Sequence, residues 1–543
     1  MNRKRLYSVI MPLGALLLLF LGVVMGRFFF AGNGRIGGAG HDKISDVVRI
    51  ISEQYVDTLD SKQLADLTLT SLLASLDPHS EYIPKESLQA VNEDLDGTFS
   101  GVGISFQIVN DTVTVVEAIT GGPAEKLGIV AGDRIISANG KKLTGTDITN
   151  EDVFKNLRGK KGTKVKLEIK RLNSPKTASY DVTRSDIPVN SVDASYIIEG
   201  THTGYMKLSK FTRNTYMEFL NALLDLDSKG MDKLVLDLRG NPGGYMEQAI
   251  LIANEFLPGG RKIVYTKSRT EENKLDAVAD GTGSHQDIPL AVIINEYSAS
   301  ASEIIAGAIQ DNDRGIVVGR RSFGKGLVQN QTMLPDSSAI RLTVARYYTP
   351  SGRSIQKEYK IGETIDYERD ILDRYNHGEF FHLDSVKLDK SKRYKTVGGR
   401  TVHGGGGIMP DIFVPEDTTG VTSYYLNVNN AGLIQQFSFK MADAYRSLLK
   451  GVKTGSHVLN IIPDDNMLLE KFADFAESKG IPARWYYINI SAALLTDQIK
   501  SFIVRDVLGY NDFYEIFNRS DRTIKAAVEF LNKGELPSSP VTR

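Results

Sequence analysis

A short apolar run that leads directly into a serine-rich turn sets the strongest constraint on how this chain can fold. Residues 289–295 (PLAVIIN) are almost wholly apolar, which predicts a buried strand in a sheet covered on both faces. The following turn (YSASAS) opens a predicted helix from Ser302 to about Gln310, with apolar residues at helical spacing. A hydroxyl in such a turn lies at a helix N-terminus, where unpaired N–H groups favour developing negative charge. The stretch is therefore a candidate nucleophile site in an α/β domain.

Two polar residues downstream of this turn could serve the same site. Lys325 lies in the sequence Phe-Gly-Lys-Gly, and Gln329 follows it four residues later. A lysine that has lost its proton can activate a serine hydroxyl. Each piece also has an ordinary explanation, because Ser302 followed by Glu303 resembles a helix N-cap and a lysine between glycines is commonly solvated. The residues alone leave both interpretations open.

Part of this stretch also matches a phosphate-binding loop. Residues 319–325 (GRRSFGK) fit the first seven positions of the pattern G-x-x-x-x-G-K-[ST]. Gly326 then stands where the pattern needs a hydroxyl to bind Mg²⁺, and residues 327–331 (LVQNQ) predict a strand instead of the required helix. Nucleotide binding is therefore not expected, and neither a cofactor nor a metal ion is predicted for this chain.

The composition excludes some classes of function. The 543 residues include 65 basic and 66 acidic side chains, so the net charge of −1 gives no bulk attraction to nucleic acid. The absence of cysteine excludes disulfides and thiol nucleophiles. The length allows three or more domains, each with its own core.

The N-terminus carries the features of a membrane segment. Residues 1–5 (MNRKR) are basic, and residues 6–26 contain no charged side chain, which is enough to cross a bilayer of about 30 Å as a helix. A cleaved signal peptide is the alternative, but the run ends in VVMGRFFF, which suits cleavage poorly. Because the basic start is expected to stay inside, we predict an anchor in the inner membrane at residues 1–30. The catalytic part would then lie on the periplasmic or extracytoplasmic side.

The pattern along the chain predicts a multidomain protein of mixed α/β and α+β class. Residues 31–40 form a Gly-rich tether, and a helical pattern follows it. This helical stretch includes a corner (LDPHSEY) with His79, which we interpret as structural. Residues 357–395 are charged without a steady period and are interpreted as an insertion or arm. The expected segments are the membrane anchor (1–30), the tether and helices (31–92), a β-rich domain (97–184), an α/β core (186–415) and a mainly helical region (416–543).

The β-rich segment resembles a PDZ domain. Residues 99–105 (FSGVGIS) are similar to the loop that binds a chain-end carboxylate, and residues 122–140 are similar to the central PDZ segment. Glycines in this loop would let successive N–H groups converge on the carboxylate, and the next strand would offer its edge to an extended peptide. A helix at about 150–157 would close the groove. The resemblance implies that peptides are bound by Gly101, Val102, Gly103 and Ile104.

From about residue 77 to residue 414 the chain resembles the C-terminal processing peptidases, also called tail-specific serine proteases. The motifs that carry the resemblance are the Ser-Ala-Ser-Ala-Ser-Glu turn, Phe-Gly-Lys-Gly and the glutamine beyond it. The resemblance implies that Ser300 is the nucleophile, Lys325 the general base and Gln329 the residue that orients the lysine. The spacing of the motifs alone leaves the roles of Ser300 and Lys325 open, and the family resemblance assigns them to a catalytic dyad.

The same family resemblance gives a role to a glycine-rich turn at residues 240–244 (GNPGG). This turn follows a predicted buried strand at residues 233–239, and on its own it would be a tight turn only. The resemblance implies an oxyanion hole formed by the N–H of Ala301 and the N–H of Gly243 or Gly244, and the sequence leaves open which glycine. Asp237 and Arg239 are expected to fix the turn by pairing or hydrogen bonding, and not to take part in proton transfer.

The predicted function is a serine endopeptidase with a Ser–Lys dyad that selects proteins by their C-terminal tails through the PDZ domain. The alternative is a membrane-tethered PDZ scaffold on an inactive protease body. A Ser–His esterase is not expected, because the G-x-S-x-G pattern is missing around Ser300. The expected partners are protein or peptide C-termini and the membrane, with no nucleic acid. The sequence leaves open a homo-oligomer, an activating partner, and whether the PDZ domain delivers substrate or gates the dyad.

Overall fold

A computed structural model describes residues 40–534, apart from residues 110, 120, 172, 173, 175 and 363. The predicted membrane anchor at residues 1–30 lies outside the described residues. Within the described part of the chain, no helix combines the length and the apolar character needed to cross a membrane. The chain divides into two compact units, Met1–Ala74 and Ser75–Arg543. The described part of the first unit consists of helices α2 (Gly40–Gln54) and α3 (Ser61–Ala74), as its helical pattern predicts.

The catalytic core is built on a six-stranded sheet in the order β10-β11-β12-β15-β16-β21, in which β10 is antiparallel to β11 and the other pairs are parallel. Its central strands are buried along almost their whole length and mainly apolar, because both faces of the sheet are covered. The strands are β10 (Val192–Ile197), β11 (Thr203–Leu208), β12 (Lys233–Asp237), β15 (Leu290–Ile294), β16 (Ile316–Gly319) and β21 (Ile412–Phe413).

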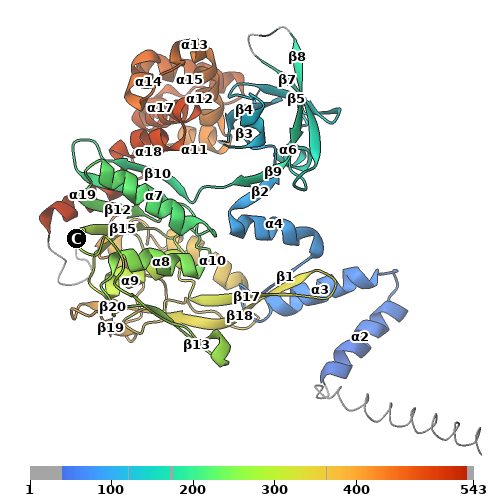
Figure 1. Ribbon diagram of the computed structural model, residues 1–543, viewed down its shortest axis with the longest axis vertical. Helices are drawn as coiled ribbons and strands as arrows, with labels where there is room; N and C mark the ends of the chain where they lie inside the picture. Colours follow the sequence, from blue (N-terminus) through green and yellow to red (C-terminus); the bar gives the residue numbers. More distant parts are fainter. Residues whose placement is uncertain are drawn as a thin grey trace, which may run out of the picture. The chain divides into compact units, whose positions relative to one another are not determined.

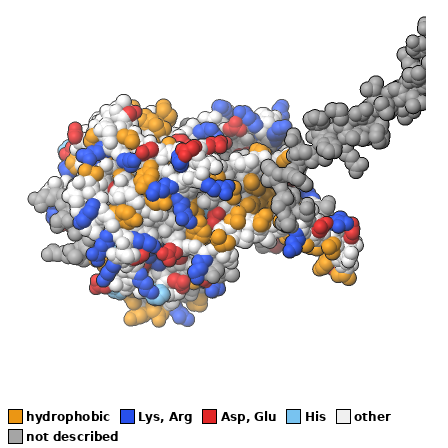
Figure 2. Space-filling model, turned by 90° about the horizontal axis from the view of Figure 1, so that it is seen from below, with side chains coloured by type: hydrophobic (Ala, Val, Ile, Leu, Met, Phe, Trp, Pro, Cys, Tyr) orange, Lys and Arg blue, Asp and Glu red, His pale blue; other side chains and the backbone are white. Residues whose placement is uncertain are grey.

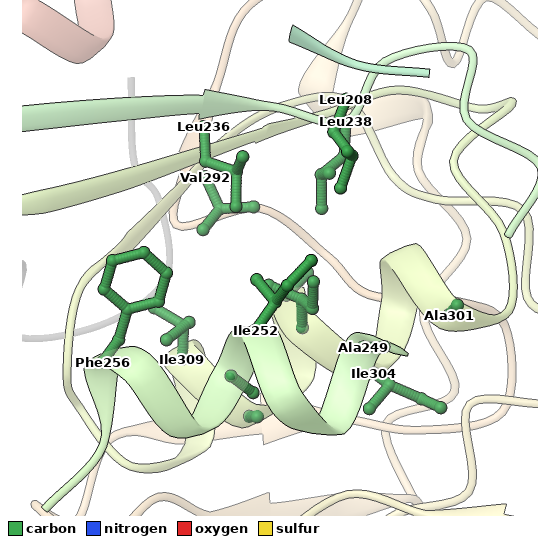
Figure 3. Packing of buried hydrophobic residues seen from close by; sticks show 14 of the residues in the cluster. Leu208, Leu236, Leu238, Ala249, Ile252, Phe256, Val292, Ala301, Ile304 and Ile309 are labelled. Carbon is green, nitrogen blue, oxygen red and sulfur yellow. The ribbon is translucent and has the colours of Figure 1, made fainter. Parts of the chain in front are cut away.

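Helices cover the two faces of this sheet with separate hydrophobic clusters. One face packs against α7 (Thr215–Ser228), α8 (Met246–Phe256) and α9 (Ala301–Asp311), whose buried side chains belong to one cluster. Figure 1 shows α8 and α9 next to each other. Figure 3 shows Leu236 and Val292 of the sheet facing Ile252 of α8 within this cluster. The other face packs against α19 (Arg522–Lys533), so the last helix of the described residues belongs to the core.

A second sheet lies beside the first and brings the downstream motif to the nucleophile turn. It has the order β1-β18-β13-β14, and β17 also pairs with β18. The alternating pattern correctly predicts β18 (Ala339–Tyr348), and the strand expected after Gly326 is β17 (Leu327–Met333). The remaining strands are β1 (Glu81–Ile83), β13 (Lys262–Ser268) and β14 (Asp276–Val278).

The β-rich segment forms its own sheet with the order β3-β4-β5-β7-β8 and with β6 paired to β5. Helix α6 (Asn150–Leu157) begins and ends where the sequence predicts it, and a short helix, α5 (Pro123–Lys126), precedes it. The antiparallel pair β2 (Thr98–Gly101) and β9 (Ser185–Pro188) joins the domain to the core after helix α4 (Lys85–Asp96). The strands are β3 (Ile104–Val109), β4 (Thr112–Ala118), β5 (Arg134–Ala138), β6 (Lys141–Lys142), β7 (Lys164–Lys170) and β8 (Thr177–Thr183).

The C-terminal region is helical, as predicted, and has a hydrophobic core of its own. The spacing of Leu468, Phe472, Phe475 and Ala476 predicts one apolar helix face; in α15 (Asp465–Ser478) three of these side chains are buried, and Phe475 is partly buried against the same core. The other helices of this core are α11 (Ser423–Asn430), α12 (Leu433–Ala444), α13 (Arg446–Leu449), α14 (Gly455–Ile461), α16 (Trp485–Ile490), α17 (Ala492–Leu508) and α18 (Tyr510–Phe517).

The expected irregular arm at residues 357–395 is wrong in part, because it contains helix α10 (Thr364–Asn376). Arg374 of this helix is buried and pairs with Glu379, which also binds Arg321 of the core. Buried charges that are fully paired replace the apolar stripe by which a helix is normally detected in sequence.

At the surface, basic and acidic side chains are interspersed on the face shown in Figure 2, which agrees with the near-zero net charge.

Candidate active site

One cleft of about 670 Å³ collects the residues that the sequence singles out. Ser300, Lys325, Gln329, Gly243 and Gly244 all line it, although they come from three separate stretches of the chain. The predicted Ala301 is fully buried directly behind this wall. The structure therefore brings the predicted site residues to one place.

Ser300 connects β15 to α9 in a strained conformation. Its φ of 55° and ψ of −113° lie in a region that residues with a side chain rarely adopt. Helix α9 begins at Ala301, so Ser300 is the N-cap, and the expected start at Ser302 is one residue too late. The hydroxyl of Ser302 instead donates a hydrogen bond of 3.0 Å to the carbonyl of Asn241. The turn thus presents Ser300 to the cleft while the helix N-terminus lies beneath it.

A buried carboxylate ties the nucleophile turn to the loop that carries the lysine. Glu303 is fully buried, and its carboxylate accepts hydrogen bonds from the N–H groups of Ser300 (2.8 Å) and Lys325 (2.9 Å). It also accepts from the N–H of Gly324 and the hydroxyl of Ser322. Sequence analysis assigned Glu303 only to a helix cap, because its partners lie about twenty residues further along. The structure identifies it as the residue that fixes both catalytic segments.

Burial raises the pKa of Glu303 from 4.5 to about 7, against the opposing effect of its four hydrogen bonds. The folded chain therefore holds this proton more tightly than the unfolded chain, and the free energy of unfolding falls as the pH rises from 4.5 to 7. We expect a loss of about 3 kcal/mol over this window, at about 1.4 kcal/mol per pKa unit. Glu303→Gln will remove this dependence, as measured by thermal unfolding at several pH values. An equal pH dependence in the parent and the variant would contradict the assignment.

Lys325 lies in surroundings that disfavour its charge. Burial lowers the pKa of Lys325, and the positive charge of Arg341 lowers it further, while Glu81, Glu303 and Asp77 oppose the shift. Among the described residues, none is within hydrogen-bond or ion-pair distance of its amine. The amine is thus free to exchange a proton in the cleft.

Gln329 shares the cleft with Lys325 but has a different partner in this structure. Its amide nitrogen donates to the hydroxyl of Thr343 at 3.3 Å, and that hydroxyl donates to the carboxylate of Asp77 at 3.0 Å. The orientation of the lysine by Gln329 stays a prediction. Asp77 belongs to the corner that precedes the PDZ-like domain, so this corner is connected to Gln329 through Thr343.

The glycine-rich turn lies against the nucleophile and presents one free N–H. A Cβ added to Gly243 would lie 2.7 Å from the Cβ of Ser300 and 3.0 Å from the nitrogen of Ala301. The N–H of Gly243 already donates to the side chain of Asn241 at 2.9 Å. In the described structure, the N–H groups of Gly244 and Ala301 have no hydrogen-bond partner. These two groups are therefore the donors available to an anion.

Two ion pairs brace the strand that leads into this turn. Arg239 binds Asp237 at 2.6 Å, as predicted, and Lys207 also approaches Asp237 at 3.4 Å. Burial raises the pKa of Asp237, but the two cations outweigh it and hold the pKa well below its ordinary value. Arg239 also binds Asp521, the N-cap of α19, at 2.7 Å. The helical region thus reaches the turn through a contact with no local signal in the sequence.

Two further side chains line the cleft, the phenol of Tyr347 and the imidazole of His79. The sequence did not indicate Tyr347, and it led us to interpret His79 as structural. The hydroxyl of Tyr347 donates to the backbone carbonyl of Ser300 at 3.1 Å and also to that of Lys325, which ties the two segments together. His79 lines the cleft and hydrogen-bonds the hydroxyl of Tyr367 at 2.8 Å. Burial first, and then the charge of Lys325, lowers the pKa of His79 to about 4. His79 is therefore neutral near pH 7.

The predicted peptide-binding loop belongs to the PDZ-like domain and presents backbone rather than side chains. Val102 and Ile104 are buried in the hydrophobic core of this domain, and Gly103 has a φ of +79° that turns the loop. Strand β3 has one strand neighbour among the described strands, so its other edge is unpaired. The ring of Phe106 on β3 meets that of Phe154 on α6 at 5.4 Å. The strand edge and α6 thus border the groove that the sequence predicts.

Comparisons with known proteins agree with this division of the chain. Residues 202–368 match peptidase family S41, residues 114–171 match the PDZ domain, and residues 424–509 match a family of unknown function (DUF8443).

The carboxy-terminal-processing protease of Bartonella bacilliformis is 40% identical over 318 residues, which are 58% of this chain and 72% of that protein. The carboxy-terminal processing protease CtpB of Bacillus subtilis is 36% identical over 320 residues, 58% of this chain and 66% of that protein. The solved photosystem II D1 C-terminal processing protease is 30% identical, with 60% of this chain and 87% of that chain covered and a TM-score of 0.33.

Proposed function

This chain belongs to the carboxy-terminal-processing proteases of peptidase family S41 and is a serine peptidase, and we propose that it cleaves proteins with a Ser300–Lys325 dyad. The observation that carries the dyad is the shared cleft, which is lined both by a strained serine and by an unpaired lysine of lowered pKa. A lysine in water has a pKa of about 10.4 and is charged at neutral pH. Burial without a counter-ion is what makes the neutral, basic form accessible.

In the proposed mechanism the neutral Lys325 accepts the proton of Ser300 while the serine oxygen attacks the substrate carbonyl. The developing oxyanion accepts hydrogen bonds from the N–H groups of Gly244 and Ala301. The lysine then gives its proton to the departing amine, which leaves an acyl-enzyme. A water molecule, deprotonated by the same lysine, hydrolyses the ester and restores Ser300.

The choice of Gly244 as the oxyanion donor gives a prediction within the turn. In Gly244→Ala a Cβ would lie 2.0 Å from the carbonyl oxygen of Phe211, so the N–H cannot keep its place. We expect kcat to fall about 10²- to 10³-fold, the usual effect of losing one oxyanion donor. Gly240→Ala is the control in the same turn, because Gly240 also has a positive φ, of 70°, but open space around it. Equal loss of kcat in both variants would contradict the assignment.

We propose further that the PDZ domain selects substrates by their C-terminal tails. Its loop of backbone groups around Gly103 and the unpaired edge of β3 are suited to a chain-end carboxylate and an extended peptide. A substrate whose C-terminus is amidated should therefore be cleaved at least about tenfold more slowly than the same substrate with a free carboxylate, since an ionic hydrogen bond is worth about 1.5–3 kcal/mol. Equal rates for the two substrates would contradict tail selection.

Deletion of residues 97–184 distinguishes the two modes of PDZ action, because it removes β2 and the PDZ sheet and ends just before β9, the strand that pairs with β2. Loss of cleavage fits delivery of the substrate by the PDZ domain. Cleavage that no longer depends on the tail fits gating of the dyad.

For the location of the protein, we propose that residues 1–30 anchor it in the inner membrane with the peptidase on the periplasmic or extracytoplasmic side. The support is the charge-free run of residues 6–26 behind a basic start. Membrane fractionation of the full chain and of a chain lacking residues 1–30 tests the proposal. Recovery of the shortened chain in the membrane fraction would contradict it.

A further inference from the structure

A second cavity, of about 700 Å³, lies where the PDZ domain meets the helical region. Its volume is within the range of binding pockets for ligands. From the PDZ side it is bordered by β3, by part of β4 and by the start of α6. From the helical side it is bordered by Gln435 and Gln436 of α12, Arg505 of α17 and Tyr510 of α18. Figure 1 shows the helical region beside β3 and β4.

The cavity runs along the unpaired edge of β3. Phe106 and Ile108 pack against the core of the PDZ domain, and Ser105 and Gln107 alternate with them toward the opposite face. All four consecutive residues border the cavity, so it reaches the edge of the strand, and Val116 and Glu117 of β4 extend its lining over the sheet. This edge is where an extended peptide would add to the sheet.

An ion-pair cluster fixes the helical region in this position. Arg134 of the PDZ domain binds Asp443 of α12 at 2.7 Å, and Arg446 binds the other oxygen of the same carboxylate at 3.1 Å. Asp443 is largely buried, and the guanidinium of Arg446 lies so close to Gly132 of the PDZ domain that a Cβ there would clash. The two walls of the cavity are therefore held together by shared charges.

The cavity is polar, and one of its polar atoms has no partner. The side-chain oxygen of Gln107 is buried without a hydrogen bond in the described structure. A buried, unpaired amide oxygen costs about 1–3 kcal/mol unless a ligand supplies a donor. Gln435, Gln436 and Arg505 border the same space; the amide nitrogen of Gln436 makes only a long hydrogen bond of 3.5 Å to the carbonyl of Ala431. The lining is thus suited to a polar, hydrogen-bonding peptide rather than to an apolar one.

The direction of the groove tells which part of a tail would enter the cavity. The C-terminal end of α6 lies near the carboxylate loop, because the carbonyl of Leu157 would be 3.6 Å from a Cβ on Gly101. The other end of α6, at Thr149 and Asn150, borders the cavity. A tail held by its carboxylate at the loop would therefore pass its upstream residues through the cavity.

We propose that the helical region forms the second wall of an extended peptide site, in which Gln435 and Gln436 bind the polar segment of a substrate tail just upstream of the residues held by the PDZ loop. This inference rests on the proposed tail selection. The inference assigns a function to residues 424–509, which match a family of unknown function. This region would bind substrate residues that the PDZ domain does not contact.

The test measures peptide affinity by fluorescence anisotropy with full-length Ser300→Ala protein. The probes are a ten-residue peptide with serine, asparagine and glutamine followed by Leu-Ala-Val, and its four C-terminal residues alone. We expect the longer peptide to bind about tenfold more tightly, the effect of one or two added hydrogen bonds. The double change Gln435→Ala and Gln436→Ala should remove this gain and leave the shorter peptide unaffected. Asn427→Ala, an exposed change on α11, is the control and should alter neither affinity.

Two results would overturn the inference, and they are distinguishable. Equal affinity of the two peptides, or an unchanged affinity of the longer peptide for the double variant, would exclude the second wall while tail selection stands. Binding of neither peptide to the parent protein would exclude tail selection itself, and the composite site with it.

Discussion

Replacement of Ser300 by alanine will lower kcat/KM for a protein substrate by about 10⁴- to 10⁶-fold, the range seen when a serine peptidase loses its nucleophile. The cleft keeps its shape, because the interactions that hold this turn use the backbone of Ser300 and not its hydroxyl. Binding of tail peptides should therefore remain at the level of the parent. Initial rates of cleavage and peptide affinity, measured on the same preparations, give both quantities.

The matched control for this change is Ser302→Ala, which removes a hydroxyl from the same turn. That hydroxyl is already bonded to the carbonyl of Asn241 and does not line the cleft. We expect a loss of about 1 kcal/mol of stability and less than a tenfold loss of activity. Comparable inactivation of both variants would show that the turn is fragile and would remove the support for Ser300 as nucleophile.

Replacement of Lys325 by alanine will lower kcat/KM by about 10³- to 10⁴-fold, because the serine then has no general base. Lys325→Arg should be nearly as inactive, since a guanidinium stays protonated at any pH at which the protein is folded. In the parent, activity requires the neutral amine, so kcat/KM should rise with pH through the lowered pKa of Lys325.

The acid limb of this profile provides an independent check. Arg341 lowers the pKa of Lys325 and is paired with Glu81, which raises it. Arg341→Gln removes the positive charge that lowers this pKa and leaves Glu81 without this cation, so the pKa of Lys325 should rise. The acid limb should then move to higher pH. A profile that moves to lower pH, or does not move, would contradict the assignment of Lys325 as the base.

Local patterns predicted a large part of this fold. Helix α8 and strand β18 occupy the ranges expected from apolar spacing and alternation, because each packs one regular face against a core. The nucleophile turn and its lysine were recognisable because they are short motifs with fixed spacing. Helix α10 was missed, because its buried Arg374 is satisfied by ion pairs instead of apolar packing.

The remainder of the site depends on contacts between distant parts of the chain. Glu303 looks like an ordinary capping residue until its bonds to Gly324 and Lys325 are seen. Asp521 lies 282 positions from Arg239, and no local pattern indicates that they meet. The proposal of Gly244 over Gly243 as the oxyanion donor also needed the structure, since only the hydrogen bond from Gly243 to Asn241 distinguishes the two glycines.

The most direct test of the account is a cleavage assay with product masses. The full-length protein and its Lys325→Ala variant would each be incubated with an unfolded protein that ends in an apolar, free C-terminus. We predict cleavage by the parent alone, with fragments that show cutting close to the tail. Cleavage by the variant at a comparable rate would contradict the Ser300–Lys325 dyad, and failure of the parent to cleave would favour a scaffold with an inactive protease body.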